Sequence, residues 1–124
     1  AASGGSSVTF VDCDVFGNRA SSNGGAIFLD ERSSFAAGGV NFTDNSAEVY
    51  GGVIHAQNGS IITTQGGTIN IFHGNSARLG GAIHAQDDSD ITFGGGGEVT
   101  LSRNFAQFQG GAVHLLRSCL FKTN

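Results

Sequence analysis

Charged residues are scarce in this sequence, and long apolar runs are missing. Charged side chains make up 13% of the 124 residues, roughly half of the usual share. Because ten residues are Phe and 39% are apolar, the composition excludes a chain that its own charge would keep unfolded. No run approaches the roughly 18 consecutive apolar residues of a membrane-spanning helix. We therefore expect a folded chain with no membrane span.

Clusters of basic residues are also missing. Six Lys and Arg stand against ten Asp and Glu, all spread along the chain, and the net charge is −4. A protein that binds nucleic acid neutralises phosphates with clustered Lys and Arg side chains. The sequence therefore disfavours nucleic acid as a partner.

Two short motifs recur along the chain at a period of about 29 residues. The first is Gly-Gly, a small residue and then Ile or Val; its copies begin at Gly24, Gly51, Gly80 and Gly110 and are 27, 29 and 30 residues apart. The second has an apolar residue three positions before Asn and occurs at residues 15–18, 42–45, 72–75 and 101–104, with a fifth copy at 121–124. Ala stands two positions after each of the first four Asn. The chain is therefore a repeat protein.

Local composition decides which kind of repeat this is. Helical repeats need stretches rich in helix-forming residues, whereas this chain has a single Lys and a Gly pair in every copy. Short alternating runs rich in β-branched and aromatic residues lie between the Gly pairs and predict strands. They cover residues 26–29, 40–42, 61–64, 91–93 and 98–101. Three such strands per copy predict a right-handed parallel β-helix, or β-solenoid, of about four coils of 27–30 residues.

We predict that residues 1–124 form a single domain. The two motifs also predict which residues form the inner walls and the corners of this β-helix. Alternation places one inward column in the strand after each Gly pair: Ile27, Ile54, Ile83 and Val113, with Leu29, Ala56, Ala85 and Leu115. A second wall is predicted from Val15, Phe42, Phe72, Leu101 and Phe121. In the third copy either Ile71 or Phe72 could take the inward position. A corner ladder is predicted from Asn18, Asn45, Asn75 and Asn104. Tight bends are predicted at Gly24, Gly25, Gly51, Gly52, Gly80, Gly81, Gly110 and Gly111.

One column faces away from the Ile wall and is our candidate for a lateral packing face. Its members are Phe28, His55, His84 and His114. Three imidazoles stacked about 4.8 Å apart could also form a metal site or a pH-sensitive face. No Cys or carboxylate ligand is readable beside them, so we predict an exposed packing surface and no metal.

Other candidate chemistry is weak. The acidic cluster Asp87, Asp88 and Asp90 has no matching acids at the same position of the neighbouring copies, so we predict no catalytic site, no enzyme activity and no cofactor. The four Gly of residues 94–97 lack the residues of a phosphate-binding loop and predict a wide turn. Thr9, Thr63, Thr92 and Thr100 are predicted to occupy different slots, which disfavours a Thr ladder of the ice-binding type.

The cysteines and two Asn raise the question of covalent modification. Cys13 and Cys119 each lie five residues before an Asn, which predicts the same slot in the first and last coils and a separation too large for a disulfide. Asn41 and Asn58 begin sequences that match the glycosylation acceptor pattern. These acceptors matter only in a eukaryotic secretory host.

The repeated tetrapeptides carry a family resemblance. Phe42-Thr-Asp-Asn45, Phe72-His-Gly-Asn75, Gly24-Gly-Ala-Ile27 and Gly80-Gly-Ala-Ile83 resemble the repeats of the polymorphic outer-membrane protein family, autotransporter adhesins with β-helical passengers. The resemblance covers the chain from Val8 onward, with Val15 and Leu101 in place of Phe in two copies. It implies an extracellular or surface-displayed solenoid that serves adhesion.

These observations lead to one functional hypothesis and two alternatives. We expect a structural or adhesive β-solenoid element of an extracellular or cell-surface assembly, with other protein chains packing end to end or laterally, and with glycans as further partners. No polar or helical cap is readable at either end, which favours a slice of a longer solenoid or a fibre subunit. A carbohydrate-binding module is the alternative, for which Tyr50, Phe105 and Phe108 supply aromatic residues near one corner. An enzyme resembling polysaccharide lyases or hydrolases ranks third.

Overall fold

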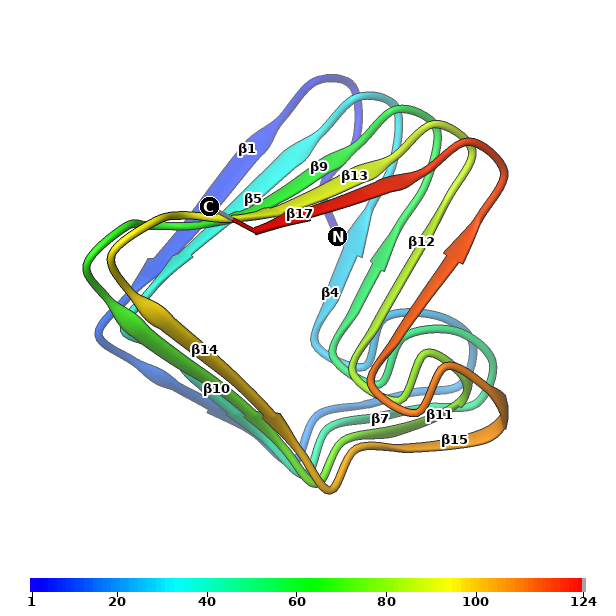
Figure 1. The fold of residues 1–124 in the computed structure, drawn as a ribbon. Coiled ribbons are helices and arrows are strands. Elements are labelled where there is room, and N and C mark those ends of the chain that lie inside the picture. The colour runs from blue at the N-terminus through cyan, green and yellow to red at the C-terminus, as the bar shows by residue number, and fades with distance from the viewer. Residues whose placement is uncertain (124) are drawn as a thin grey trace.

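The computed structural model, described here for residues 1–123, is a parallel β-solenoid of about four coils (Figure 1). In Figure 1 the chain runs anticlockwise around the coil and advances toward the viewer from the N-terminal to the C-terminal coil, which is a right-handed path. Every pairing between the named strands is parallel. The described residues contain no helix of the length and apolarity that a membrane crossing requires. The predicted parallel β-solenoid is confirmed.

Four sheets line the coil, and each takes one strand from every turn of the chain. Sheet 1 contains β1 (Ser7–Val11), β5 (Ser34–Gly38), β9 (Ile61–Thr64), β13 (Asp90–Phe93) and β17 (Leu120–Thr123). Sheet 2 contains β2 (Asp14–Phe16), β6 (Asn41–Thr43), β10 (Ile69–His73) and β14 (Glu98–Ser102). Sheet 3 contains β3 (Arg19–Ala20), β7 (Ser46–Ala47), β11 (Ser76–Leu79) and β15 (Phe105–Gln109). Sheet 4 contains β4 (Ile27–Leu29), β8 (Ile54–Ala56), β12 (Ile83–Gln86) and β16 (Val113–Leu116).

The structure has four strands per coil where the sequence predicts three. Sheet 3 is the additional one, and its strands β3 and β7 are only two residues long. Two residues are too few to produce the alternation from which strands are recognised. The Gly residues 94–97 lie between β13 and β14 and form the wide turn expected of them.

The coils stack in register along the predicted inner walls. Ile27 pairs with Ile54, Ile54 with Ile83, and Ile83 with Val113. Phe72 pairs with both Phe42 and Leu101 and is fully buried, whereas Ile71 is only half-buried. The inward slot therefore belongs to Phe72. The third copy is one residue shorter between Asn75 and Gly80, and a register shift between Ala77 and Leu79 absorbs the difference.

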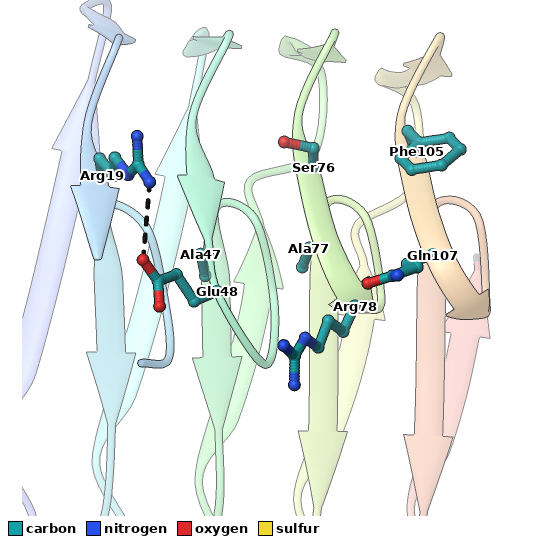
Figure 2. Close-up of a pocket in the computed structure, with 8 residues that line it drawn as sticks. All are labelled: Arg19, Ala47, Glu48, Ser76, Ala77, Arg78, Phe105 and Gln107. Carbon is teal, nitrogen blue, oxygen red and sulfur yellow. Dashed lines mark ion pairs between the residues drawn. The ribbon is translucent and has the colours of Figure 1, made fainter. Parts of the chain in front are cut away.

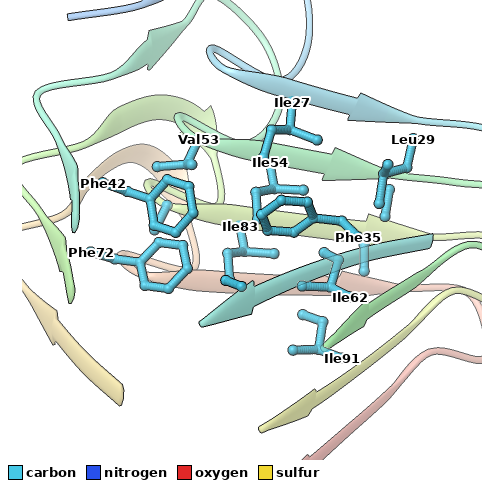
Figure 3. Packing of buried hydrophobic residues seen from close by; sticks show 14 of the residues in the cluster. Ile27, Leu29, Phe35, Phe42, Val53, Ile54, Ile62, Phe72, Ile83 and Ile91 are labelled. Atoms are coloured by element: carbon cyan, nitrogen blue, oxygen red, sulfur yellow. The ribbon is translucent and has the colours of Figure 1, made fainter. Parts of the chain in front are cut away.

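The core is a column of aromatic and aliphatic side chains inside the coil (Figure 3). The rings of Phe42 and Phe72 stack with centroids 4.6 Å apart, and Phe35 packs edge-on against Phe42 at 6.1 Å. All three rings are fully buried, as are Ile54 and Ile83. Each such burial stabilises the fold by roughly 1.5–3 kcal/mol.

Outside sheet 4, three sequence-based placements are wrong, and the first concerns Phe121. This residue belongs to β17, where it pairs with Ile91 of sheet 1 and is 39% exposed. It therefore does not extend the wall of Phe42 and Phe72. Its distance of 20 residues from Leu101 is too short for a full coil. The fifth Asn motif ends at Asn124, which lies outside the described residues.

The second wrong placement concerns the cysteines, which occupy different corners. Cys13 precedes Asp14, the partner of Asn41, so it shares a slot with Val40. Cys119 precedes Leu120, the partner of Asp90, so it takes the slot of Ser89. Both thiols are free, as expected.

The third wrong placement concerns the threonines. Thr9, Thr63 and Thr92 share one column of sheet 1, in which Ala36 takes the second position and Lys122 the fifth. Only Thr100 lies elsewhere, paired with Ile71 in sheet 2. The column is interrupted by Ala36 and ends in a cation, so it is not a continuous Thr ladder.

Candidate functional site

The predicted asparagines form a ladder at the corner between sheets 2 and 3. Asn75 donates its side-chain amide to Oδ1 of Asn104 at 2.9 Å and to the carbonyl oxygen of Phe42 at 3.0 Å. Asn45 repeats the pattern one coil earlier, with Oδ1 of Asn75 and the carbonyl oxygen of Val15 as acceptors. Asn45 and Asn75 are fully buried. Each amide thus joins the coil before it to the coil after it.

The Gly pairs lie between sheets 3 and 4, and their two positions are restricted for different reasons. Gly51 has φ +62°, a conformation that L side chains rarely adopt. A Cβ on Gly52 would collide with the main-chain oxygen of Gly81 in the next coil and with the main chain of Ser76. The first positions of the other pairs share the positive φ: Gly24, Gly80 and Gly110. Gly25 and Gly81 likewise lie against the main chain of the following coil.

The histidine column forms, but it does not form the exposed packing face that the sequence predicts. His55 and His84 are fully buried. Their rings stack with centroids 5.1 Å apart, and His84 stacks on His114 at 4.9 Å. Tyr50 covers them, with its ring centroid 4.4 Å from that of His84. Phe28 closes the other end against His55 at 5.4 Å.

The cover over the histidines comes from the connection between sheets 3 and 4. In Figure 1 this connection swings outward and returns before it enters sheet 4. Tyr50 lies in it and is bridged to Asn23 and Leu79 of the neighbouring coils. This path buries one side of sheet 4. The prediction that His55 and His84 belong to an exposed lateral packing face is therefore wrong. Phe28 and His114 remain half-buried.

Burial keeps the imidazoles of His55 and His84 neutral. Removal from water, together with the neighbouring His55 and His114, lowers the pKa of His84 to about 3. Neither ring nitrogen of His84 has a hydrogen-bond partner. Burial also lowers the pKa of His55, although a hydrogen bond to Gln57 and the charge of Asp30 oppose this effect. His55 and His84 are therefore uncharged at neutral pH.

Asn41 and Asn58, the two candidate glycosylation sites, are exposed. The Asn41 side-chain amide donates to Oδ1 of Asp14 at 2.8 Å. The Asn58 amide donates to Oδ1 of Asp30 at 2.7 Å, and Asn58 has φ +54°. Both side chains reach the surface, where a modifying enzyme would have to meet them.

The acidic cluster takes part in the turns between sheets 4 and 1. Oδ1 of Asp87 accepts a hydrogen bond from Nη1 of Arg117 at 2.8 Å. Oδ1 of Asp90 accepts a hydrogen bond from the main-chain N–H of Leu120 at 3.1 Å. These carboxylates join the third coil to the fourth.

A groove of about 530 Å³ lies over sheet 3, and the sequence analysis did not identify it (Figure 2). The small, buried side chains of Ala47 and Ala77 form its floor. Longer side chains rise on either side of this floor, and the groove is lined by Arg19, Glu48, Ser76, Arg78, Phe105 and Gln107. The sequence does contain a pattern that marks the groove, because these residues flank the Ala that stands two positions after each Asn of the ladder.

The groove carries charge, amide groups and one bare aromatic ring. Arg19 and Glu48 approach to 3.5 Å, with side chains that are 76% and 55% exposed, so the pair is worth at most about 1 kcal/mol. Arg78 is exposed and makes no ion pair within the described part of the chain. Phe105 is 64% exposed. Tyr50 instead stacks on the histidines, so it is not part of an aromatic platform for ligands.

The fold and these corners define a repeat protein whose unit is one coil of a parallel β-solenoid. Three segments of the chain, residues 12–30, 39–57 and 71–86, match the model of the Chlamydia polymorphic membrane protein repeat. These three segments are thus repeats of this family, as their tetrapeptides indicate. Comparison with curated proteins and with solved structures gave no match.

The matched segments coincide with one part of each coil. Each of them spans strands of sheets 2, 3 and 4 together with the Asn and Gly-Gly corners, and none includes a strand of sheet 1. Arg19, Glu48 and Arg78 therefore lie inside the family repeat.

Proposed function

We propose that this chain is a structural and adhesive element displayed on a cell surface, where it packs against other protein chains and serves as a scaffold rather than a catalyst. The observation that carries the proposal is the in-register stack of family repeats, joined by buried asparagines between coils. A stack of this kind is a rigid rod, which suits a surface projection. Membership of the repeat family supports the surface location.

End-to-end packing is supported by the two terminal coils. Strands β14, β15, β16 and β17 each lie at the edge of their sheet, as do β1, β2, β3 and β4 at the other end. An unpaired strand edge is a template for another strand. Partly buried Val99, Leu101, Val113 and Leu115 continue the core toward the C-terminal coil. Another coil of the same kind, in the same polypeptide or in another chain, would fit such an edge.

Two neighbouring leucines of β16 allow a matched test of this packing. Leu115 continues the inward column of Ala56 and Ala85, whereas Leu116 is 38% exposed. We expect the purified chain to form oligomers that grow with concentration in sedimentation velocity and appear as rods in electron microscopy. Leu115→Lys should abolish them and Leu116→Lys should preserve them, with circular dichroism confirming that both variants fold. A monomer at every concentration, or equal effects of the two variants, would overturn end-to-end packing.

The surface location and the adhesive role need their own measurement. Antibodies against this chain should label intact, unpermeabilised cells that produce the full-length protein. Beads coated with the folded chain should adhere to epithelial cells more than beads coated with the heat-denatured chain. Labelling that requires permeabilisation, or equal adhesion of the two kinds of bead, would contradict the proposal.

A further inference from the structure

The groove over sheet 3 presents side chains from successive coils in rows parallel to the solenoid axis. Arg19 pairs with Ser46, Ser46 with Ser76, and Ser76 with Phe105, which forms one row. On the other side of the alanine floor, Glu48, Arg78 and Gln107 come from three consecutive coils (Figure 2). Neighbouring coils are about 4.8 Å apart, which is close to the length of one pyranose unit. An extended chain of sugar rings can therefore meet one coil per ring.

The groups in the groove are those that recognise an acidic sugar. Arg78 provides a guanidinium with no intramolecular carboxylate partner in residues 1–123, and such a fork binds a carboxylate through two hydrogen bonds. Gln107 and Ser76 add an amide and a hydroxyl for sugar hydroxyls. The exposed ring of Phe105 offers an apolar face against which the C–H face of a pyranose can lie.

We propose that this groove binds an acidic polysaccharide, a linear chain of carboxylate-bearing sugars that lies along the solenoid axis. Arg78 holds a carboxylate, and Phe105 packs against the ring bound one coil further on. The inference rests on the proposed adhesive function and names the chemical class of its ligand.

The main chain of sheet 3 explains why a sugar fits this groove better than a peptide does. An extended peptide binds a sheet through unpaired main-chain groups at an edge. Here the amides already donate within the solenoid: Ser46 to Asn18, Ser76 to Asn45 and Phe105 to Asn75, at 2.8–2.9 Å. A ligand over the face of sheet 3 therefore meets side chains, among which Arg78 matches a carboxylate and Ser76 and Gln107 match hydroxyls.

The test uses the whole chain and a hexamer of galacturonic acid as the probe, with affinity measured by titration calorimetry. We expect Arg78→Gln to weaken binding about tenfold or more, the effect of losing a charged hydrogen bond. Phe105→Ala should weaken it by a similar factor. Arg32→Gln and Phe16→Ala are the matched controls, because both residues are exposed on other parts of the coil. The controls should bind within about twofold of the unmodified chain.

The proposal would be overturned by equal binding of a neutral maltohexaose, by equal binding of a hexaglutamate peptide, or by unchanged affinity in Arg78→Gln. Equal binding of the peptide would identify a general site for acidic chains. Failure of the hexamer to bind would also reject the groove as a sugar site. That failure leaves the oligomerisation and adhesion tests unaffected, so the two proposals fail separately.

Discussion

Oδ1 of Asn75 accepts two hydrogen bonds from Asn45 of the preceding coil, one from the main-chain N–H at 2.9 Å and one from the side-chain amide at 3.1 Å. Both residues are fully buried. One side-chain atom thus fixes the register between two passes of the chain that lie 30 residues apart.

Asn75→Ala should lower the free energy of unfolding by about 2–4 kcal/mol. The substitution leaves the buried Asn45 N–H without a partner, which costs on the order of 1–3 kcal/mol, and it also removes the hydrogen bonds from Asn75 to Asn104 and to the Phe42 carbonyl. Denaturant unfolding measures the change. Asn41→Ala is the control, because Asn41 is exposed and should cost less than about 1 kcal/mol. Equal losses in the two variants would contradict the role of the ladder.

Gly52→Ala should cost on the order of 3 kcal/mol or more, because its methyl group would overlap the main chain of the next coil. Gly67→Ala is the matched control. Gly67 has φ +74° with nothing within 4 Å of an added Cβ, so only backbone strain of about 1–2 kcal/mol applies. Thermal unfolding of both variants checks the order. A more stable Gly52→Ala than Gly67→Ala would show that the coils do not approach so closely.

Phe72→Ala should cost about 3–5 kcal/mol, since it removes a buried ring that stacks on Phe42. The neighbouring Ile71→Ala should cost about 1 kcal/mol or less, because Ile71 is half-buried on the opposite side of the strand. Denaturant midpoints of the two variants give the comparison. If Ile71→Ala were the more damaging substitution, the register of β10 would be off by one residue.

Acid should destabilise the chain through His84. Its pKa is about 3 in the folded chain, against 6.5 for the unperturbed side chain, so the unfolded state binds the proton more readily. The contribution to stability is full above about pH 6.5 and is lost progressively as the pH falls toward 3. The loss amounts to at most about 5 kcal/mol.

Two substitutions test this pH dependence. His84→Phe should flatten the fall in stability between pH 6.5 and 4. A Phe is expected to fit there, because Phe28 occupies the same position of the column in the first coil. His73→Phe, on sheet 2, should leave the fall unchanged. Unfolding free energies at several pH values measure both. An unaltered slope in His84→Phe would show that the column is hydrated.

The stacked fold and its inner walls could be predicted because the sequence repeats them explicitly. Asn45 and Asn75, or Ile54 and Ile83, occupy the same positions of successive copies and pair in the structure. Sheet 3 could not be predicted, because a strand of two residues such as β7 leaves no alternation. The column of Thr9, Thr63 and Thr92 was readable, since the intervals between these residues follow the copy lengths.

The candidate sites were less predictable than the fold. The burial of His55 and His84 depends on Tyr50, whose counterparts Asn23 and Leu79 are not aromatic. No periodic pattern could reveal that cover. The groove arises because alanines form a low floor between longer side chains such as Arg78 and Phe105. Its residues flank a motif, yet their joint shape appears only after the coils are stacked.

Nuclear Overhauser spectroscopy of the labelled chain tests the stacking of coils most directly. The account predicts cross-peaks between Asn45 and Asn75 and between Thr63 and Thr92. Because β9 and β13 are parallel, the residue after Thr63 should contact the residue after Thr92, which means that Thr64 pairs with Phe93. Partners that move in opposite directions, or the absence of any contact between Asn45 and Asn75, would contradict the account.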